Sequence, residues 1–299
     1  MNHVDFDYLR LHLIVFLTGL TPSAVKMIDL PFVEIVFYRT LLTVLLLALY
    51  IAYRRYPFRY PRAAVFKMIG SGALLSLFWV FYTLSVQTST ASVAAVGAAT
   101  TTLWITLLEP LIFKRKTKAF QGLMALNAVF GIYIIYNSDF AYNEGFAFGI
   151  AAGFFGALLT IQSSLFSKKS YNSFSITFYQ MLGACIGTGL FIPIYVYLLP
   201  NLSGGNFAYQ MTWKDFLLIL FLVITLSIYA WAMLIRVMKK IAPFTVALVN
   251  NLTPIYAIMI AILFFSQAEL MNLGFYVGTL LLLISVFAYP LLRHHAKQS

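Results

Sequence analysis

The chain has 299 residues, of which 62% are hydrophobic and only 10% charged. A soluble domain carries about 25% charged residues, so this composition excludes a water-covered globular protein and places most of the surface against lipid. The net charge of +11 comes from basic residues between apolar runs, a pattern typical of membrane topology signals and not of nucleic-acid binding. Cys185 is the single cysteine, which excludes an intramolecular disulfide.

Apolar runs follow one another along the whole chain, separated by short polar connections. A transmembrane helix needs about 20 apolar residues, and ten such runs fit this length. We therefore predict an all-α membrane protein with ten transmembrane helices. The expected spans are 9–28, 32–52, 65–86, 90–113, 119–136, 146–166, 173–199, 214–235, 242–265 and 272–292.

Basic residues gather in alternate connections, which indicates the orientation of the chain. The intervening connections carry few positive charges and hold Asp139, Glu144 and Glu269. By the positive-inside rule, we expect both termini in the cytoplasm and the protein in the cell inner membrane. The basic groups are Arg54, Arg55, Arg59, Arg62 and Lys67; Lys114, Arg115, Lys116 and Lys118; Lys168 and Lys169; and Arg236, Lys239 and Lys240.

The two halves of the sequence resemble each other. Phe37-Tyr38-Arg39 matches Phe178-Tyr179-Gln180, and the segment Ala91–Trp104 runs parallel to Pro243–Tyr256. We predict two five-helix repeats, residues 1–140 and 141–299. Because five is odd, the second repeat enters the membrane with the opposite orientation. Inverted repeats are a common plan of secondary transporters, with the substrate site near the midplane between the halves.

Glycines recur at four-residue spacing in three of the later spans. Small residues at this spacing let helices approach closely in a membrane. We expect tight helix contacts at Gly145, Gly149 and Gly153, at Gly183 and Gly187, and at Gly274 and Gly278.

Arg39 is the basic residue that lies deepest within a predicted span. It stands about 12 Å from the outer end of that span at a rise of 1.5 Å per residue. A charge at this depth costs on the order of 3 kcal/mol and marks a functional candidate. The guanidinium suits a carboxylate or phosphate of a substrate. Pairing with Glu34, five residues earlier, is the structural alternative.

Two glutamates are candidates for gating or proton coupling. Glu34 lies near the outer end of the second span, and Glu109 precedes Pro110 near the inner end of the fourth. The proline frees a backbone carbonyl and kinks the helix. A plain salt bridge from Glu109 to Lys114 or Arg115 is the alternative to an inner gate.

Polar and aromatic residues gather at mid-depth in several spans. Asparagine at membrane depth must face protein or a wet cavity, and Pro254 frees the carbonyl of Asn250. Packing is the alternative role for any one aromatic residue. Together with Arg39, the candidate substrate-binding residues are Trp79, Tyr82, Thr101, Trp104, Tyr179, Gln180, Trp231, Asn250, Asn251 and Tyr256.

The order of these features resembles the EamA-type transporters of the drug/metabolite transporter superfamily. The resemblance rests on the span with Arg39 and on the segments 89–95, 250–254 and 278–284. It covers nearly the whole chain and implies ten spans in two inverted halves that carry metabolites. The chain departs from the family pattern at Thr101-Thr102, at Lys114-Arg115-Lys116 and at Gln267, positions that concern helix interiors and ends.

We predict a secondary transporter that moves a small anionic or zwitterionic metabolite, such as an amino acid, by alternating access, with export as the expected direction. A channel or facilitator and a multidrug exporter are the alternatives, although an exporter of cations would need a buried acid. An enzyme is not expected, because all five aspartates lie in loops or at span edges, the histidines lie near the termini, and no metal-ligand pair or phosphate-cradling glycine loop appears. We expect no cofactor and no metal. The expected partners are the substrate and the lipid bilayer, a homodimer is compatible with the sequence, and nucleic acid is excluded.

Overall fold

The computed structural model describes residues 3–112, 114, 119–138, 140–169, 171–199, 207, 210–241, 246, 249–250, 252–266 and 270–284. Within these ranges every regular element is a helix, in agreement with the predicted all-α class. In the part of the chain that the structure describes, six helices are long and apolar enough to cross a membrane, and two further apolar helices are shorter. The chain is therefore a multi-pass α-helical membrane protein. The count of ten spans stays a prediction, because parts of the last two expected spans lie outside the described residues.

Helices in the first half follow the first five expected spans, and two of these spans are broken near their middle. Leu20 separates α1 from α2, whose first turn holds Pro22, and Thr100 separates α5 from α6. Proline is tolerated in a first helical turn, where its missing N–H group has no helical partner. The elements are α1 (His3–Gly19), α2 (Thr21–Lys26), α3 (Phe32–Tyr53), α4 (Arg62–Thr88), α5 (Ala91–Ala99), α6 (Thr101–Ile112), α7 (Ala119–Ser138) and the 3-10 turn η1 (Phe140–Tyr142).

The eighth expected span of the chain, which belongs to the second half, is partly π-helical. There a π-helical segment, η2, joins two α-helices, α11 and α12, into one continuous apolar span. The elements are α8 (Asn143–Ser167), α9 (Ser173–Leu198), α11 (Trp213–Phe221), η2 (Leu222–Ala230), α12 (Trp231–Val237), α14 (Thr253–Phe265) and a final helix, Leu273–Ile284.

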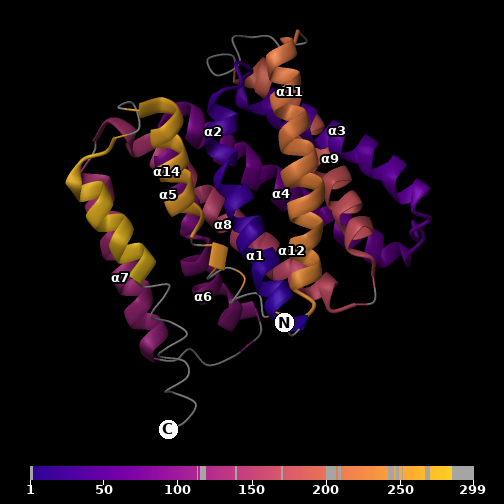
Figure 1. Ribbon diagram of the computed structural model, residues 1–299, viewed down its shortest axis with the longest axis horizontal. Coiled ribbons are helices and arrows are strands. Elements are labelled where there is room, and N and C mark those ends of the chain that lie inside the picture. The colour runs from indigo at the N-terminus through magenta and orange to yellow at the C-terminus, as the bar shows by residue number, and fades with distance from the viewer. Residues whose placement is uncertain are drawn as a thin grey trace.

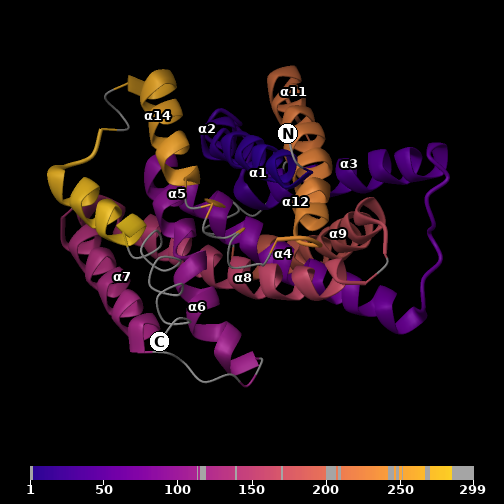
Figure 2. The ribbon, with the colours of Figure 1, turned by 60° about the horizontal axis from the view of Figure 1, so that its bottom comes forward.

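The two halves pack against each other along most of their length. Helix α4 contacts α8 and α9, α3 contacts α9 and η2, α5 contacts α8 and α14, and α1 contacts α14 and η2. In both ribbon views α7 and the final helix lie side by side at one edge of the molecule, while α3 extends toward the other (Figures 1 and 2). The halves therefore form one body, and their inverted relation and the boundary at residues 140 and 141 stay predictions.

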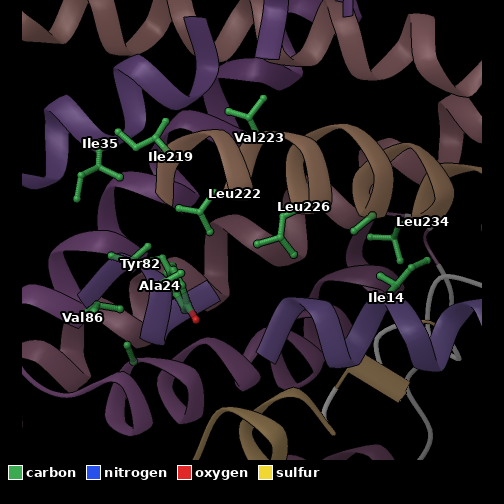
Figure 3. Packing of buried hydrophobic residues seen from close by; sticks show 14 of the residues in the cluster. Ile14, Ala24, Ile35, Tyr82, Val86, Ile219, Leu222, Val223, Leu226 and Leu234 are labelled. Atoms are coloured by element: carbon green, nitrogen blue, oxygen red, sulfur yellow. The ribbon is translucent and has the colours of Figure 1, made fainter. Parts of the chain in front are cut away.

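An apolar cluster joins the halves through α1, α2, α3, α4 and the eighth span. Figure 3 shows Leu222 and Leu226 of η2 on the side where Tyr82 of α4 and Ala24 of α2 lie. Because lipid tails are as apolar as leucine, this cluster stabilises the fold by close packing and not by removal from water. Shape at these contacts therefore matters more than hydrophobicity.

The predicted glycine contacts are confirmed at several helix crossings. A Cβ atom on Gly97 of α5 would lie 2.7 Å from the Cα atom of Gly149 of α8. Gly183 of α9 lies directly against the carbonyl oxygen of Ile69 of α4, and Gly278 contacts α7. A side chain at these positions would push the backbones apart.

We expect Gly183→Ala to lower the free energy of unfolding by about 1–3 kcal/mol, the usual cost of overpacking a close contact. Its matched control is Gly70→Ala in α4, because a Cβ atom there meets no atom within 4 Å. Thermal unfolding of both purified variants measures the difference. Equal stability of the two variants would contradict the tight crossing of α4 and α9.

Candidate functional site

A cavity of about 150 Å³ lies between the two halves. Both broken spans of the first half, η2, α12 and α14 contribute to its wall, and none of its lining residues belongs to α7 or to the final helix. Its lining is apolar with hydroxyl groups, one amide and one charge. The lining residues are Ile14, Thr18, Thr21, Arg39, Phe78, Trp79, Tyr82, Ala95, Ala98, Ala99, Thr101, Thr102, Gly156, Leu159, Thr160, Leu226, Ala230, Trp231, Leu234, Asn250, Thr253 and Pro254.

Arg39 supplies the charge of this cavity. Its side chain is only 5% exposed, and its guanidinium carbon lies 3.9 Å from the centroid of the Trp79 ring. Its Nε donates a hydrogen bond of 2.8 Å to Oγ of Ser227. The aromatic face and the hydroxyl oxygen both offer negative charge density to the cation. Arg39 also interacts electrostatically with Tyr82. In the described part of the chain, its side-chain hydrogen bond uses Nε and neither of the terminal nitrogens.

Ser227, which accepts the hydrogen bond from Arg39, belongs to the π-helical segment η2. Its hydroxyl donates a 3.4 Å hydrogen bond to the carbonyl of Leu222, five residues earlier, which is the π-helical spacing. Short π-helical segments are frequent at functional sites. The sequence analysis missed Ser227, since a serine in an apolar span has no pattern of its own. A search of the second half for a polar side chain at the same membrane depth as Arg39 would have pointed to Ser227.

Six of the residues predicted to bind substrate line the cavity: Arg39, Trp79, Tyr82, Thr101, Trp231 and Asn250. The Tyr82 ring stacks on Phe78 with 5.9 Å between centroids. Oγ1 of Thr101 donates to the carbonyl of Gly153. Oδ1 of Asn250 is buried and has no hydrogen-bond donor among the described residues. This oxygen is therefore an acceptor that a ligand or water can satisfy.

Two predicted aromatic residues pack away from the cavity wall. The Trp104 ring meets Phe154 edge-on at 5.2 Å within a cluster of α6 and α8, and Tyr256 meets Phe16 edge-on at 5.6 Å. Both contacts join helices of different halves, so these two rings stabilise the bundle.

Two neighbouring residues of α9, Tyr179 and Gln180, also lie outside the cavity lining. The Tyr179 hydroxyl donates to the carbonyl of Phe58, in the connection between α3 and α4. Gln180 is fully buried and hydrogen-bonds Nε1 of Trp231, which does line the cavity. Gln180 thus contacts the wall from behind.

The predicted acidic residues lie apart from Arg39 where the structure describes them. Glu34 is fully buried in the first turn of α3 and interacts electrostatically with Tyr195 of α9. Five residues on an α-helix turn about 140° relative to each other, so Glu34 and Arg39 face different sides of α3. The side chain of Glu109 and all of Asn251 lie outside the described residues.

The family model of the EamA-like transporter family matches the chain twice, at residues 8–137 and 143–289. The chain belongs to the EamA-like transporter family. No curated protein matches this EamA-like chain. A protein of known crystal structure is similar to it with a TM-score of 0.65 and 12% identity, over 96% of this chain and 98% of that chain. That likeness shows the fold alone, whereas the family establishes a membrane transporter.

We expect Ser227→Ala to destabilise this transporter by about 1.5–3 kcal/mol, because it removes a hydrogen bond to a buried cation. Thr225→Val is the matched control, since the Thr225 hydroxyl bonds only the carbonyl of Phe221 in its own helical turn. Thermal unfolding of the two variants measures the difference. An equal loss in both would show that Arg39 does not depend on Ser227.

Proposed function

We propose that this EamA-like protein is a secondary transporter that exports a small anionic or zwitterionic metabolite, such as an amino acid, across the inner membrane. The observation that carries the proposal is the charge of the cavity. Among the described residues that line it, Arg39 is the one charged residue, and none of them carries a carboxylate. In a low-dielectric cavity a guanidinium favours an acidic group and can hold it by two parallel hydrogen bonds.

The same observation separates this proposal from a multidrug exporter of cations. A cationic ligand would have to approach a buried cation with no compensating acid on the described part of the wall, and like charges at close range repel strongly. The amide of Asn250 and the hydroxyls of Thr101, Thr102 and Thr253 add neutral hydrogen-bonding groups for a polar ligand.

Contacts between the halves at both ends of the bundle support alternating access. Before α3 begins, the Asp29 N–H donates to Asp215 at 3.0 Å, and Lys214 forms a 2.8 Å ion pair with Asp29. After α3 ends, the hydroxyl of Tyr60 accepts a 3.2 Å hydrogen bond from the Asn172 N–H. Opening of one end while the other stays closed would expose the cavity to one side of the membrane at a time. A channel would require both ends to be open together.

The expected effect of Arg39→Gln is a loss of binding of about 2–5 kcal/mol, the scale for breaking a buried charged pair. Arg39→Lys should recover only part of it, because the ammonium lacks the planar fork. The measurement is the half-saturation concentration for uptake into liposomes, from a panel of amino acids, nucleobases and phosphorylated compounds.

Lys67→Gln, which changes an exposed basic residue of α4, is the control for general charge effects. Uptake should also show counterflow, in which unlabelled substrate inside the liposome drives accumulation of labelled substrate. Equal affinity of wild type and Arg39→Gln for every transported compound would refute the proposed role of Arg39. Transport without saturation and counterflow would indicate a channel.

The proposed orientation predicts the side from which single cysteines react in a Cys185→Ser background. Cysteine at Asn143 should react with an impermeant maleimide added outside intact cells. Asn143 lies in the connection between the fifth and sixth expected spans, which is poor in positive charge and is therefore expected outside the cell. Cysteine at Arg55, an exposed residue after α3, or at Lys116, which lies outside the described residues, should react only after the membrane is opened. The reverse pattern would overturn cytoplasmic termini.

A further inference from the structure

Gln180 joins three helices through a single buried amide. Its Nε2 donates to Oγ of Ser71 at 3.1 Å and to Oγ of Ser163 at 2.9 Å, while its Oε1 accepts from Nε1 of Trp231 at 3.0 Å. These partners belong to α4, α8 and α12. Both amide protons and the amide oxygen therefore have partners inside the protein, and the side chain is fully buried.

Trp231 separates this amide from the cavity. The indole lines the cavity, whereas Gln180 does not. Trp231 packs against an apolar cluster that contains Leu159, Met181 and Trp79. Apolar packing of this kind supplies no directional bond that would fix the rotation of the ring. A buried indole N–H requires an acceptor, and here that acceptor is Gln180. The orientation of the Trp231 ring thus depends on Gln180, a residue outside the cavity lining.

The contacts of Gln180 mirror those of Arg39 in the other half. Arg39 and Gln180 occupy the same place in the matching segments Phe37-Tyr38-Arg39 and Phe178-Tyr179-Gln180. Arg39 contacts a tryptophan of its own half, Trp79 of α4, and a serine of the opposite half in η2. Gln180 contacts a tryptophan of its own half, Trp231 of α12, and a serine of the opposite half in α4.

The two tryptophans also correspond along the sequence. Trp79 precedes Ala91 by 12 residues, and Trp231 precedes Pro243 by 12 residues, where Ala91 and Pro243 begin the second pair of matching segments. In the first half the residue at this place, Arg39, lines the cavity itself and brings a positive charge to it. In the second half Gln180 does not line the cavity, and its neutral partner Trp231 does. The two matching sites therefore contribute different chemical groups to the cavity.

We propose that Gln180 is a positioning residue that fixes the Trp231 indole as the apolar wall of the site and so sets the size of the substrate's apolar part. The acidic group of the substrate lies at Arg39, and its apolar body packs on Trp231. This inference rests on the proposed function for its effect on transport, whereas the fixed position of the ring is independent of it.

The first test observes the ring without any ligand. Fluorotryptophan in place of the four tryptophans gives fluorine NMR signals, of which Trp231→Phe identifies the one from Trp231. We expect Gln180→Met, which keeps the size of the side chain but removes its hydrogen bonds, to shift and broaden that signal. Ser163→Ala, which removes one acceptor and keeps the amide, should shift it less. An unchanged signal in both variants would overturn the proposal.

Thr188→Val is the matched control in the same helix. Its hydroxyl forms a buried 2.7 Å hydrogen bond with Ser76 of α4, so the variant also removes a contact between α4 and α9. Thr188 is not among the described lining residues, and its hydrogen bonds go to Ser76 and Ala184 and not to Trp231, so the Trp231 signal should remain at its wild-type position. A shift equal to that of Gln180→Met would show a general loosening of the helix contact and would overturn the specific role of Gln180.

The second test asks whether Gln180 acts on transport through Trp231. For the transported anion with the largest apolar part, Gln180→Met should raise KM about fivefold, the fold-change of one neutral hydrogen bond. In a Trp231→Phe background the same change should have almost no effect, because the ring that it positions has lost its N–H group. Equal effects in both backgrounds would overturn the inference. Failure of anion transport itself would refute the proposed function, and the NMR signal would still decide the role of Gln180.

Discussion

The buried guanidinium of Arg39 is the interaction on which the site depends. A positive charge inside an apolar span costs on the order of 3 kcal/mol, and the protein offsets this cost with the face of Trp79 and the hydroxyl of Ser227. Since Trp79 belongs to the first half and Ser227 to the second, the charge is stable only where the two halves meet. The cavity and the interface between the two halves of the chain are therefore one feature of the molecule.

Irregular helices create the space around this charge. The breaks between α1 and α2 and between α5 and α6 place four cavity-lining threonines beside the helix ends, and η2 widens the eighth span. Irregular backbone at membrane depth is tolerated where it lines a cavity, because water or substrate can then satisfy the freed polar groups. Away from these irregular segments, helices cross at glycines, and close backbone contacts such as Gly97 with Gly149 hold them together.

Composition and spacing were sufficient to predict the helical class and the glycine contacts, because lipid imposes simple rules on residue type along each span. The family was predicted from the resemblance of several segments to the EamA-type transporters. Depth in the membrane could also be read, and it led to Arg39, Trp79 and Asn250, which line the cavity. The rotation of each helix about its own axis could not be predicted from the sequence. Neighbours such as Tyr179 and Gln180 share a depth but point about 100° apart on an α-helix, and neither is among the lining residues of the cavity. The π-helical turn that presents Ser227 follows no α-helical period, so sequence periodicity gave no sign of it.

The charge preference of the cavity is tested most directly with three ligands of nearly one shape. These are the best-transported amino acid of the panel, its deaminated acid, which is an anion, and its carboxamide, which is a cation. Competition for uptake into liposomes by wild-type protein compares them without any mutation. We predict that the acid competes with the amino acid and that the carboxamide does not, because Arg39 attracts the acidic group and repels a net positive charge. Competition by the carboxamide as strong as that by the acid would contradict the account.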